Sequence, residues 1–252
     1  MSSISPEADP FTADGGPVGA LVLHGFTGSP RTVRPWAEHL AAAGLTVRAP
    51  LLAGHGSSWQ DLAKTGWTDW YASAERAFTE LRGHCEQVFV AGISMGACLA
   101  FRLAETQGDR VQGLVVVNPS LANDNPLITL APVLKYVLHS VSSIGGDIKN
   151  PAAAEGAAKR TPVAAVATLP RLWKTTSAEL SSVTQPVLVF RSTVDHVVGP
   201  ASMKVLQAAL PGAEVRMLDN SYHVATLDND APEIFAGTLA FVTKHSQAAK
   251  RV

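Results

Sequence analysis

Short runs of hydrophobic residues recur along the chain and are separated by longer segments with helical periodicity. The runs are continuously apolar rather than alternating with polar residues, as expected for strands that are covered on both faces. They lie at residues 18–23, 45–48, 87–91, 111–117, 186–190 and 214–218. Helical patterns lie between them, at roughly 30–43, 67–82, 95–107, 200–210 and 231–244. This alternation predicts an α/β fold with a mostly parallel central sheet flanked by helices.

The alternation is interrupted once, between Val117 and Pro186. This stretch shows no convincing strand and is punctuated by six prolines before Pro186. Its pattern predicts helical segments at about 126–142, 151–158 and 162–176. The N-terminal residues are polar and rich in Gly, Pro and Asp, which predicts irregular structure. The expected organisation is an irregular arm at 1–16, an α/β core at 17–119 and 184–252, and a helical cap inserted at 120–183.

Composition narrows the class of protein. Hydrophobic residues make up 46% of the chain, enough for a sizeable core, whereas charged residues make up only 16%. The net charge of −1 and the scattered basic residues provide no field for nucleic acid, so no nucleic-acid partner is expected. The N-terminus lacks the features of a signal peptide, and no apolar stretch is long enough to span a bilayer. We therefore expect a cytoplasmic protein, with peripheral attachment to a membrane left open.

A serine between glycines follows the predicted strand at 87–91. The segment reads Gly92-Ile93-Ser94-Met95-Gly96 and leads directly into a helical pattern. In a nucleophile elbow, serine occupies a tight strand-to-helix turn, and the glycines are needed because a Cβ would collide with neighbouring backbone. The helix N-terminus also favours negative charge that develops at the serine. The motif alone is weak and could be an ordinary tight turn, but its context predicts Ser94 as a catalytic nucleophile.

A serine hydroxyl is a poor nucleophile at neutral pH and needs a general base. In this fold the expected chain order is serine, acid, histidine. His223 follows the last predicted strand, so its loop faces the same crevice as the elbow. Asp195 follows the strand at 186–190 and is positioned to orient the imidazole. We predict a catalytic triad of Ser94, Asp195 and His223.

Other acids and histidines compete for these roles. Asp219 ends the last predicted strand and could brace a loop, whereas Asp228 follows the histidine and is therefore in the wrong order. His196 comes directly after the predicted acid, where a structural role is favoured over a catalytic one. His245 lies in a charged C-terminal tail and is expected to be solvated.

The oxyanion of an ester intermediate needs two fixed N–H donors. One is the backbone N–H of Met95, and the other is expected from the Gly-rich loop after the first strand, where the Phe26 N–H is the candidate. His24 in this loop is expected to brace it rather than join the triad. His55 in a second glycine-rich loop is expected to be hydrogen-bonded. No second ligand stands at metal-binding spacing, so no metal is predicted.

The predicted cap is unusually apolar. A helix that is hydrophobic nearly all round needs burial on more than one face. One face can pack on the core while the other lines an acyl pocket or meets a lipid surface, and a contact between two copies of the chain, giving a homodimer, is the alternative. The apolar positions are Leu127, Ile128, Leu130, Val133, Leu134, Val137, Leu138, Val141 and Ile144.

Five short elements together resemble the bacterial monoacylglycerol lipases and the related small carboxylesterases of the α/β-hydrolase superfamily. They are His24-Gly25-Phe26-Thr27-Gly28, Gly54-His55-Gly56, Gly92-Ile93-Ser94-Met95-Gly96, Asp195-His196-Val197-Val198 and Ser221-Tyr222-His223-Val224. The resemblance implies hydrolysis of monoacylglycerols and short-to-medium acyl esters without a cofactor. It also implies a small cap whose apolar outer face touches lipid. By the same resemblance, Ile144 and Glu155 correspond to the residues that hold the glycerol head group.

The predicted function is therefore hydrolysis of a carboxylic ester through an acyl-enzyme intermediate, with a small lipid ester as substrate. General carboxylesterase, thioesterase and carbon–carbon bond hydrolase activities are alternatives on the same elbow, and a cofactor-free haloperoxidase activity is a more distant one. A non-catalytic small-ligand-binding protein on this fold is the alternative from a different class.

Overall fold

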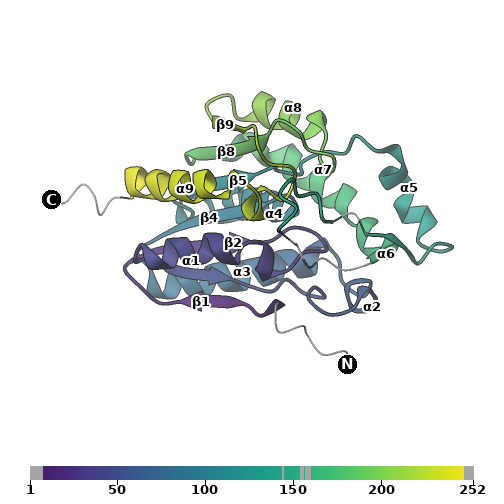
Figure 1. The fold of residues 1–252 in the computed structure, drawn as a ribbon, viewed down its shortest axis with the longest axis horizontal. Coiled ribbons are helices and arrows are strands. Elements are labelled where there is room, and N and C mark those ends of the chain that lie inside the picture. The colour runs from purple at the N-terminus through teal and green to yellow at the C-terminus, as the bar shows by residue number, and fades with distance from the viewer. Residues whose placement is uncertain (1–7, 144, 154–155, 157–159, 247–252) are drawn as a thin grey trace.

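The structure is a computed structural model that describes residues 8–143, 145–153, 156 and 160–246. Within these residues, a seven-stranded sheet has the order β1-β3-β2-β4-β5-β8-β9 (Figure 1). All neighbouring strands are parallel except β1 and β3, which pair antiparallel. The mostly parallel sheet predicted from the alternating pattern is thus confirmed. The strands are β1 (Phe11–Ala13), β2 (Val18–Leu23), β3 (Thr46–Ala49), β4 (Gln87–Ile93), β5 (Gly113–Val117), β8 (Val187–Ser192) and β9 (Glu214–Leu218).

Helices cover both faces of the sheet (Figure 1). On one face, Leu21 and Leu23 of β2 pack in a cluster with residues of α3, α4, α7 and α8. On the other, Ala20 and Val22 pack in a second cluster with residues of α1 and α9. Successive residues of a strand point to opposite faces, so a sheet covered on both sides requires apolar residues at every position. The helices are α1 (Arg34–Ala42), α2 (Trp59–Leu62), α3 (Trp67–His84), α4 (Met95–Gln107), α7 (Leu169–Glu179), α8 (Pro200–Ala209) and α9 (Ala231–His245).

The N-terminal arm contains a strand that the sequence pattern did not reveal. Phe11–Ala13 form β1, which pairs with β3 and closes that edge of the sheet. The buried Arg48 of β3 fastens the arm, since its guanidinium donates to the Asp14 carboxylate at 2.8 Å and to the Ala13 carbonyl at 3.2 Å. Three residues are too few to show a period, so the expectation of a wholly irregular arm at 1–16 was wrong for its last part.

The cap between β5 and β8 also differs from its expected form. Helix α5 (Pro126–Leu134) ends well before residue 142, and the chain turns through Leu138 into β6 (Ser140–Ser142). Strand β6 pairs antiparallel with β7 (Arg160–Pro162), so the cap contains a small two-stranded sheet where no strand was expected. Residues 151–153 of the helix expected at 151–158 form a turn and no helix, and half of that segment lies outside the described residues. A short helix, α6 (Val163–Val166), and α7 complete the insertion, and Figure 1 shows α5 and α6 projecting from one side of the core.

Strand β4 and helix α4 approach one another unusually closely at the turn that joins them. A Cβ placed on Gly92 would come within 2.5 Å of the Gly96 backbone, and one on Gly96 would collide with the carbonyl oxygens of Leu23 and His24. Both obstacles are backbone atoms, which cannot rotate away as a flexible side chain can. Glycine at these two positions is therefore a packing requirement of the fold.

No helix among the described residues combines the length and the hydropathy needed to cross a bilayer.

The close approach at Gly92 predicts a large stability cost for a single methyl group. Gly92→Ala should lower the free energy of unfolding by about 3 kcal/mol or more, because the backbone of β4 and α4 must separate. The matched control is Gly83→Ala in α3, where a Cβ meets nothing within 4 Å. It should raise stability by about 0.5–1 kcal/mol through helix propensity. Urea unfolding of the three proteins measures both effects, and similar midpoints for Gly92→Ala and the wild type would contradict the packing argument.

A buried carboxylate on α4 predicts a pH-dependent stability. The Glu105 side chain is fully buried, Oε2 accepts from Arg102 at 2.8 Å, and Oε1 has no hydrogen-bond partner among the described residues. Burial raises the pKa of Glu105 from 4.5 to about 7, even though Arg102 opposes the shift. The folded state therefore prefers the protonated form, and this contribution to stability is full below pH 4.5 and lost as the pH rises through about 7.

Glu105→Gln mimics the protonated side chain at every pH. Its melting temperature relative to the wild type should increase between pH 5 and pH 8, with each 1 kcal/mol corresponding to roughly 2–4 °C in a domain of this size. Thermal unfolding across this pH range tests the prediction, with the exposed Glu86→Gln as control. A difference in melting temperature that stays constant with pH would rule out the buried carboxylate as its source.

Candidate active site

Ser94 occupies the turn between β4 and α4 in a conformation that side chains rarely adopt. Its φ is 56° and its ψ is −119°, and its N–H donates to the Val117 carbonyl of β5 at 2.9 Å. From Gln87 to Phe101 it is the only residue that is not buried. Strained backbone of this kind persists only where surrounding structure enforces it, and here it lifts one hydroxyl out of a fully packed segment. The turn has the geometry expected of a nucleophile elbow.

His223 and Asp195 are hydrogen-bonded to one another across two loops. Nδ1 of His223 lies 3.0 Å from Oδ2 of Asp195, and both side chains are nearly inaccessible to solvent. The loops follow β9 and β8, so parallel neighbouring strands bring together residues 28 positions apart. An ionised carboxylate can only accept, so Nδ1 carries the proton and Nε2 is left with its lone pair.

The environment of Asp195 favours its ionised form. Burial alone raises the pKa of this carboxyl group, but the hydrogen bond and charge of His223 outweigh it, with help from the Val198 N–H and Arg191, so the pKa lies below its ordinary value. Oδ1 accepts from the N–H groups of Val197 and Val198 at 2.9 and 2.8 Å. Asp195 is thus held in place on both oxygens, as an orienting acid requires.

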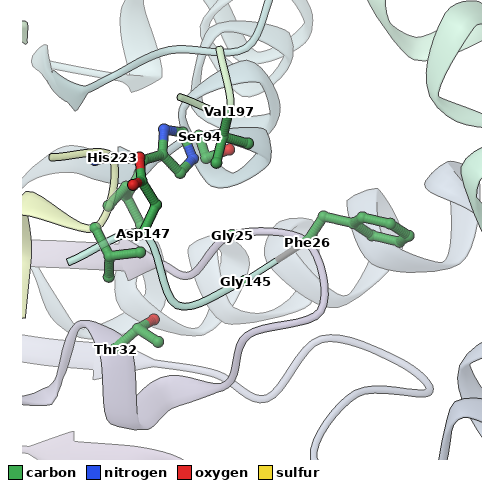
Figure 2. Close-up of a pocket in the computed structure, with 10 residues that line it drawn as sticks. Gly25, Phe26, Thr32, Ser94, Gly145, Asp147, Val197 and His223 are labelled. Atoms are coloured by element: carbon green, nitrogen blue, oxygen red, sulfur yellow. Dashed lines mark hydrogen bonds between the residues drawn. The ribbon is translucent and has the colours of Figure 1, made fainter. Parts of the chain in front are cut away.

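Ser94 and His223 line the same small cavity, of about 50 Å³, together with Phe26, Thr32 and Asp147. Figure 2 shows the imidazole of His223 beside the Ser94 side chain. A second cavity of about 470 Å³ also opens onto Ser94. Its walls include Phe26, Met95, Ile128, Leu169 and Trp173, so apolar side chains from the core and the cap meet there. Ser94 therefore stands between a small, partly polar cavity and a larger, mainly apolar one.

Two backbone N–H groups beside Ser94 are free to bind an anion. Gly25 approaches so closely that a Cβ on it would lie 3.4 Å from the Ser94 Cβ, which brings the 24–28 loop against the elbow. Neither the Phe26 N–H nor the Met95 N–H donates a hydrogen bond within the part of the chain that the structure describes. Met95 N–H belongs to the first turn of α4, whose N–H groups point outward. The arrangement fits the two donors that an oxyanion requires.

His24, the first residue of this loop, and His55 form a buried pair with ring centroids 5.0 Å apart. Burial lowers the pKa of His24 to about 4 and that of His55 to about 3, so both are neutral at physiological pH. His24 contacts the Gly25 carbonyl through Nδ1 at 2.9 Å and accepts from the Leu52 N–H through Nε2 at 3.2 Å. It thereby ties the 24–28 loop to the segment after β3, which agrees with a bracing role rather than a catalytic one.

Asn118 was not identified from the sequence. It directly follows β5 with φ of 44°, and its amide donates to the Ser192 hydroxyl at 2.9 Å and to the His223 carbonyl at 2.8 Å. Its oxygen accepts from the Ser192 N–H at 2.8 Å. Asn118 thus joins the ends of β5 and β8 to the loop that carries His223. A polar residue immediately after a buried strand was the available signal.

Two aspartates connect the cap to the same loop. Asp228, considered as a rival acid, accepts from the N–H groups of Lys149, Asn150 and Tyr222 at 2.7 to 2.9 Å. Asp147 Oδ2 accepts from the His223 N–H at 3.2 Å, while its Oδ1 lies 2.8 Å from the His196 ring. Both carboxylates hold loops rather than contact the His223 ring by a hydrogen bond. Their role could not be read from the sequence because most of their partners are backbone N–H groups of distant loops.

Three further residues were singled out in the sequence: Asp219 as a rival acid, and Ile144 and Glu155 as head-group contacts. Asp219 accepts from the Thr193 hydroxyl at 2.6 Å, which agrees with loop bracing. Ile144 and Glu155 lie outside the described residues. No cluster of His, Cys, Asp and Glu side chains suited to a metal ion occurs among the residues the structure describes.

Comparison with known proteins identifies the family of the chain. Residues 19–230 match the Hydrolase_4 family, described as serine aminopeptidase, S33. A thermostable monoacylglycerol lipase of Bacillus sp. (strain H-257) is 42% identical over 242 residues, which is 95% of this chain and 96% of the relative.

Solved structures give the same result at the level of the fold. A structure from work on LipS and LipT, two metagenome-derived lipolytic enzymes, superposes with a TM-score of 0.92 at 36% identity, covering 96% of this chain and 100% of that one. The monoacylglycerol lipase of Paleococcus ferrophilus, at 20% identity, shares the fold with a TM-score of 0.79 over 94% of this chain and 99% of that one. The resemblance that the sequence motifs suggested is confirmed, and the chain belongs to the Hydrolase_4 family of α/β-hydrolases.

Proposed function

We propose that this protein is a monoacylglycerol lipase, which hydrolyses the ester of a monoacylglycerol to a fatty acid and glycerol. The observation that carries the proposal is the hydrogen-bonded pair of His223 and Asp195 beside a strained, partly exposed Ser94. The choice of substrate is supported by the 42% identity with a relative named as a monoacylglycerol lipase.

In the proposed mechanism, Ser94 Oγ attacks the ester carbonyl while His223 Nε2 takes its proton. Asp195 stabilises the imidazolium that forms. The N–H groups of Phe26 and Met95 stabilise the oxyanion of the tetrahedral intermediate. His223 then protonates the leaving alcohol, and an acyl group remains on Ser94. Water repeats the sequence and releases the fatty acid. No cofactor takes part in these steps.

The two cavities beside Ser94 suit the two parts of a monoacylglycerol. The larger cavity, lined by Ile128, Leu169 and Trp173, provides an apolar environment for the acyl chain. The smaller one offers polar groups to the glycerol, namely the Thr32 side chain and the Asp147 carboxylate. Gly145, which also lines the smaller cavity, directly follows Ile144 in the chain. We propose Ile144 and Glu155 as further contacts of the glycerol head group.

We also propose that the cap meets a lipid surface through α5 and the turn after it. Leu127, Val133 and Val137 are 63%, 70% and 78% exposed, and Leu130, Tyr136 and Leu138 are exposed beside them. Large apolar side chains gathered in this way are costly in water and mark an interaction surface. Their position on the element that also supplies Ile128 to the larger cavity favours a lipid over a second copy of the chain. The protein would then draw its substrate from the surface on which it rests.

The proposed mechanism predicts the effect of removing the nucleophile. Ser94→Ala should lower the hydrolysis of a medium-chain monoacylglycerol by roughly 1,000-fold or more and should abolish labelling by a fluorophosphonate. Ser181→Ala, at an exposed serine remote from the site, serves as control. Wild-type turnover by Ser94→Ala would contradict the assignment of the nucleophile, and no labelling of the wild type would favour a non-catalytic binding protein.

The same assay identifies the preferred substrate class when esters with the same acyl chain but different alcohol groups are compared. Monoacylglycerol should be hydrolysed faster than the corresponding triacylglycerol, because only a small alcohol fits a cavity of about 50 Å³. Faster cleavage of a simple ester or of an acyl thioester would favour the carboxylesterase or thioesterase alternative.

The proposed lipid surface predicts weaker membrane binding after polar substitution. Combined Leu127→Ser, Val133→Ser and Val137→Ser should reduce binding to phosphatidylcholine vesicles by about tenfold or more, since a loss of only about 60 Å² of apolar contact, at roughly 25 cal/mol per Å², corresponds to a factor of ten. Met217→Ser removes an apolar side chain that is 51% exposed on β9 and should leave binding unchanged. Vesicle flotation measures the effect. A wild-type dimer that the triple variant abolishes, with no vesicle binding by either protein, would show instead that copies of the chain meet at this surface.

A further inference from the structure

A largely buried arginine, Arg191, contacts the carboxylate oxygen of Asp195 that also faces His223. Arg191 lies on β8, four residues before Asp195. Its Nη1 donates to Oδ2 of Asp195 at 2.6 Å, and this same oxygen receives Nδ1 of His223 at 3.0 Å. Its Nη2 donates to the Val198 carbonyl at 2.7 Å. The Arg191 side chain is 11% exposed and that of Asp195 is 0% exposed.

This contact has two opposing consequences for the reaction. The two hydrogen bonds of Arg191 reach Asp195 and, three residues later, the Val198 carbonyl, which fixes the carboxylate within its loop. However, the carboxylate also has to stabilise the imidazolium that forms when His223 takes the serine proton. A guanidinium on the same carboxylate oxygen places a permanent positive charge beside that imidazolium. The guanidinium and the imidazolium share one carboxylate oxygen, so their positive charges are close enough to repel one another, and burial limits screening by water and salt.

We infer that Arg191 is a positioning residue with two effects on Asp195: it fixes the carboxylate, and it weakens the attraction of that carboxylate for protonated His223. His223 therefore stays available as a base in more acidic solution. This inference rests on the proposed catalytic triad. A neutral side chain at position 191 would leave the full charge of Asp195 to the imidazolium. The activity of such a variant would therefore fail at a higher pH than that of the wild type.

Other charged groups surround the same pair and do not replace Arg191. From the cap, Asp147 accepts from the His223 backbone N–H, and its second oxygen engages the exposed His196 ring. Asp228 accepts from the Tyr222 N–H, and Lys149 lies 3.4 Å from the Asp219 carbonyl. Asp124 lines the larger cavity together with Asp195. Among the described residues, Arg191 and His223 are the two basic side chains that contact the Asp195 carboxylate.

A purely structural role for Arg191 makes a different prediction. If the side chain only held the loop through Asp195 and Val198, its loss would lower stability and maximal rate without moving the pH dependence. The midpoint of the acidic limb of the pH–rate profile therefore separates the two roles, because it reports charge beside the base rather than the amount of active protein.

The experiment compares kcat/KM for a soluble short-chain aryl ester from pH 5 to 9 at high ionic strength. Arg191→Met removes the charge, Arg191→Gln removes it but keeps a donor, and Arg191→Lys keeps it. The midpoint of the acidic limb should rise by about one pH unit in the Met and Gln variants and should stay close to the wild type in the Lys variant. At the wild-type midpoint, kcat/KM of the neutral variants relative to their own plateau would then be lower by roughly fivefold.

Arg216→Met is the matched control. Arg216 lies on the neighbouring strand β9, is 37% exposed, and pairs with Glu214 rather than with a residue of the site. Its loss removes the same charge from the adjacent strand and should leave the midpoint unchanged. An equal shift in this control would assign the effect to overall charge and overturn the inference, as would an unchanged or lower midpoint in Arg191→Met and Arg191→Gln.

A second measurement does not depend on turnover. The imidazole of His223 can be followed by NMR titration in a Ser94→Ala background, with and without Arg191→Gln. A rise of about one unit in the titration midpoint supports the inference even where hydrolysis is abolished, and no rise overturns it. The proposed function fails separately, if the wild type neither hydrolyses esters nor reacts with a fluorophosphonate.

Discussion

The close approach of helix α4 to strands β2 and β4 is the constraint on which the rest of this structure depends. With glycine at positions 92 and 96, the backbone can turn within a few residues from the centre of the sheet into a buried helix. The turn forces Ser94 to a positive φ and leaves it as the accessible residue of an otherwise packed segment. It also aims the first N–H groups of α4 at the space beside the hydroxyl. The same packing thus supplies both the nucleophile and one side of the proposed oxyanion site.

The parallel sheet brings the remaining groups to this point, but loops have to hold them there. The segments after β2, β5, β8 and β9 all begin at the carboxyl edge of the sheet, where Ser94 stands. Buried polar side chains hold these segments. His24 ties the segment after β2 to Leu52, and Asn118 ties the segment after β5 to those of Ser192 and His223. Asp228 ties the segment after β9 to the cap. Because these bonds are buried, leaving any of them unpaired would cost more than an exposed bond contributes. The precision of the site therefore comes from a network around it as well as from the residues in it.

The inner and outer sides of the cap face different environments. On its inner side, Ile128 and Trp173 help to line the larger cavity next to Ser94, and Asp147 reaches the backbone of His223. On its outer side, α5 exposes most of its apolar residues. A helix that was expected to be buried on more than one face is thus largely unburied in the isolated chain. This exposure is the physical basis of the proposed contact with lipid, since apolar surface of this extent is stabilised when it leaves water.

The hydrophobic pattern determined the order of the main strands and helices, because a sheet covered on both faces needs continuous apolar runs and the helices between them need one apolar stripe. The motifs in the sequence also determined the candidates for nucleophile, acid and base, since the glycines of the elbow and the chain order of the three residues can be read directly from the sequence. Strands of three residues such as β1 and β6 carry no readable period and exist only through their pairing partners. The contacts of Arg191, Asn118, Asp147 and Asp228 likewise follow from which loops the folded sheet brings together. Sequence specifies which chemical groups are present and roughly which element carries them, whereas only tertiary structure decides which of them touch, because hydrogen bonds between distant loops depend on distances that no local pattern contains.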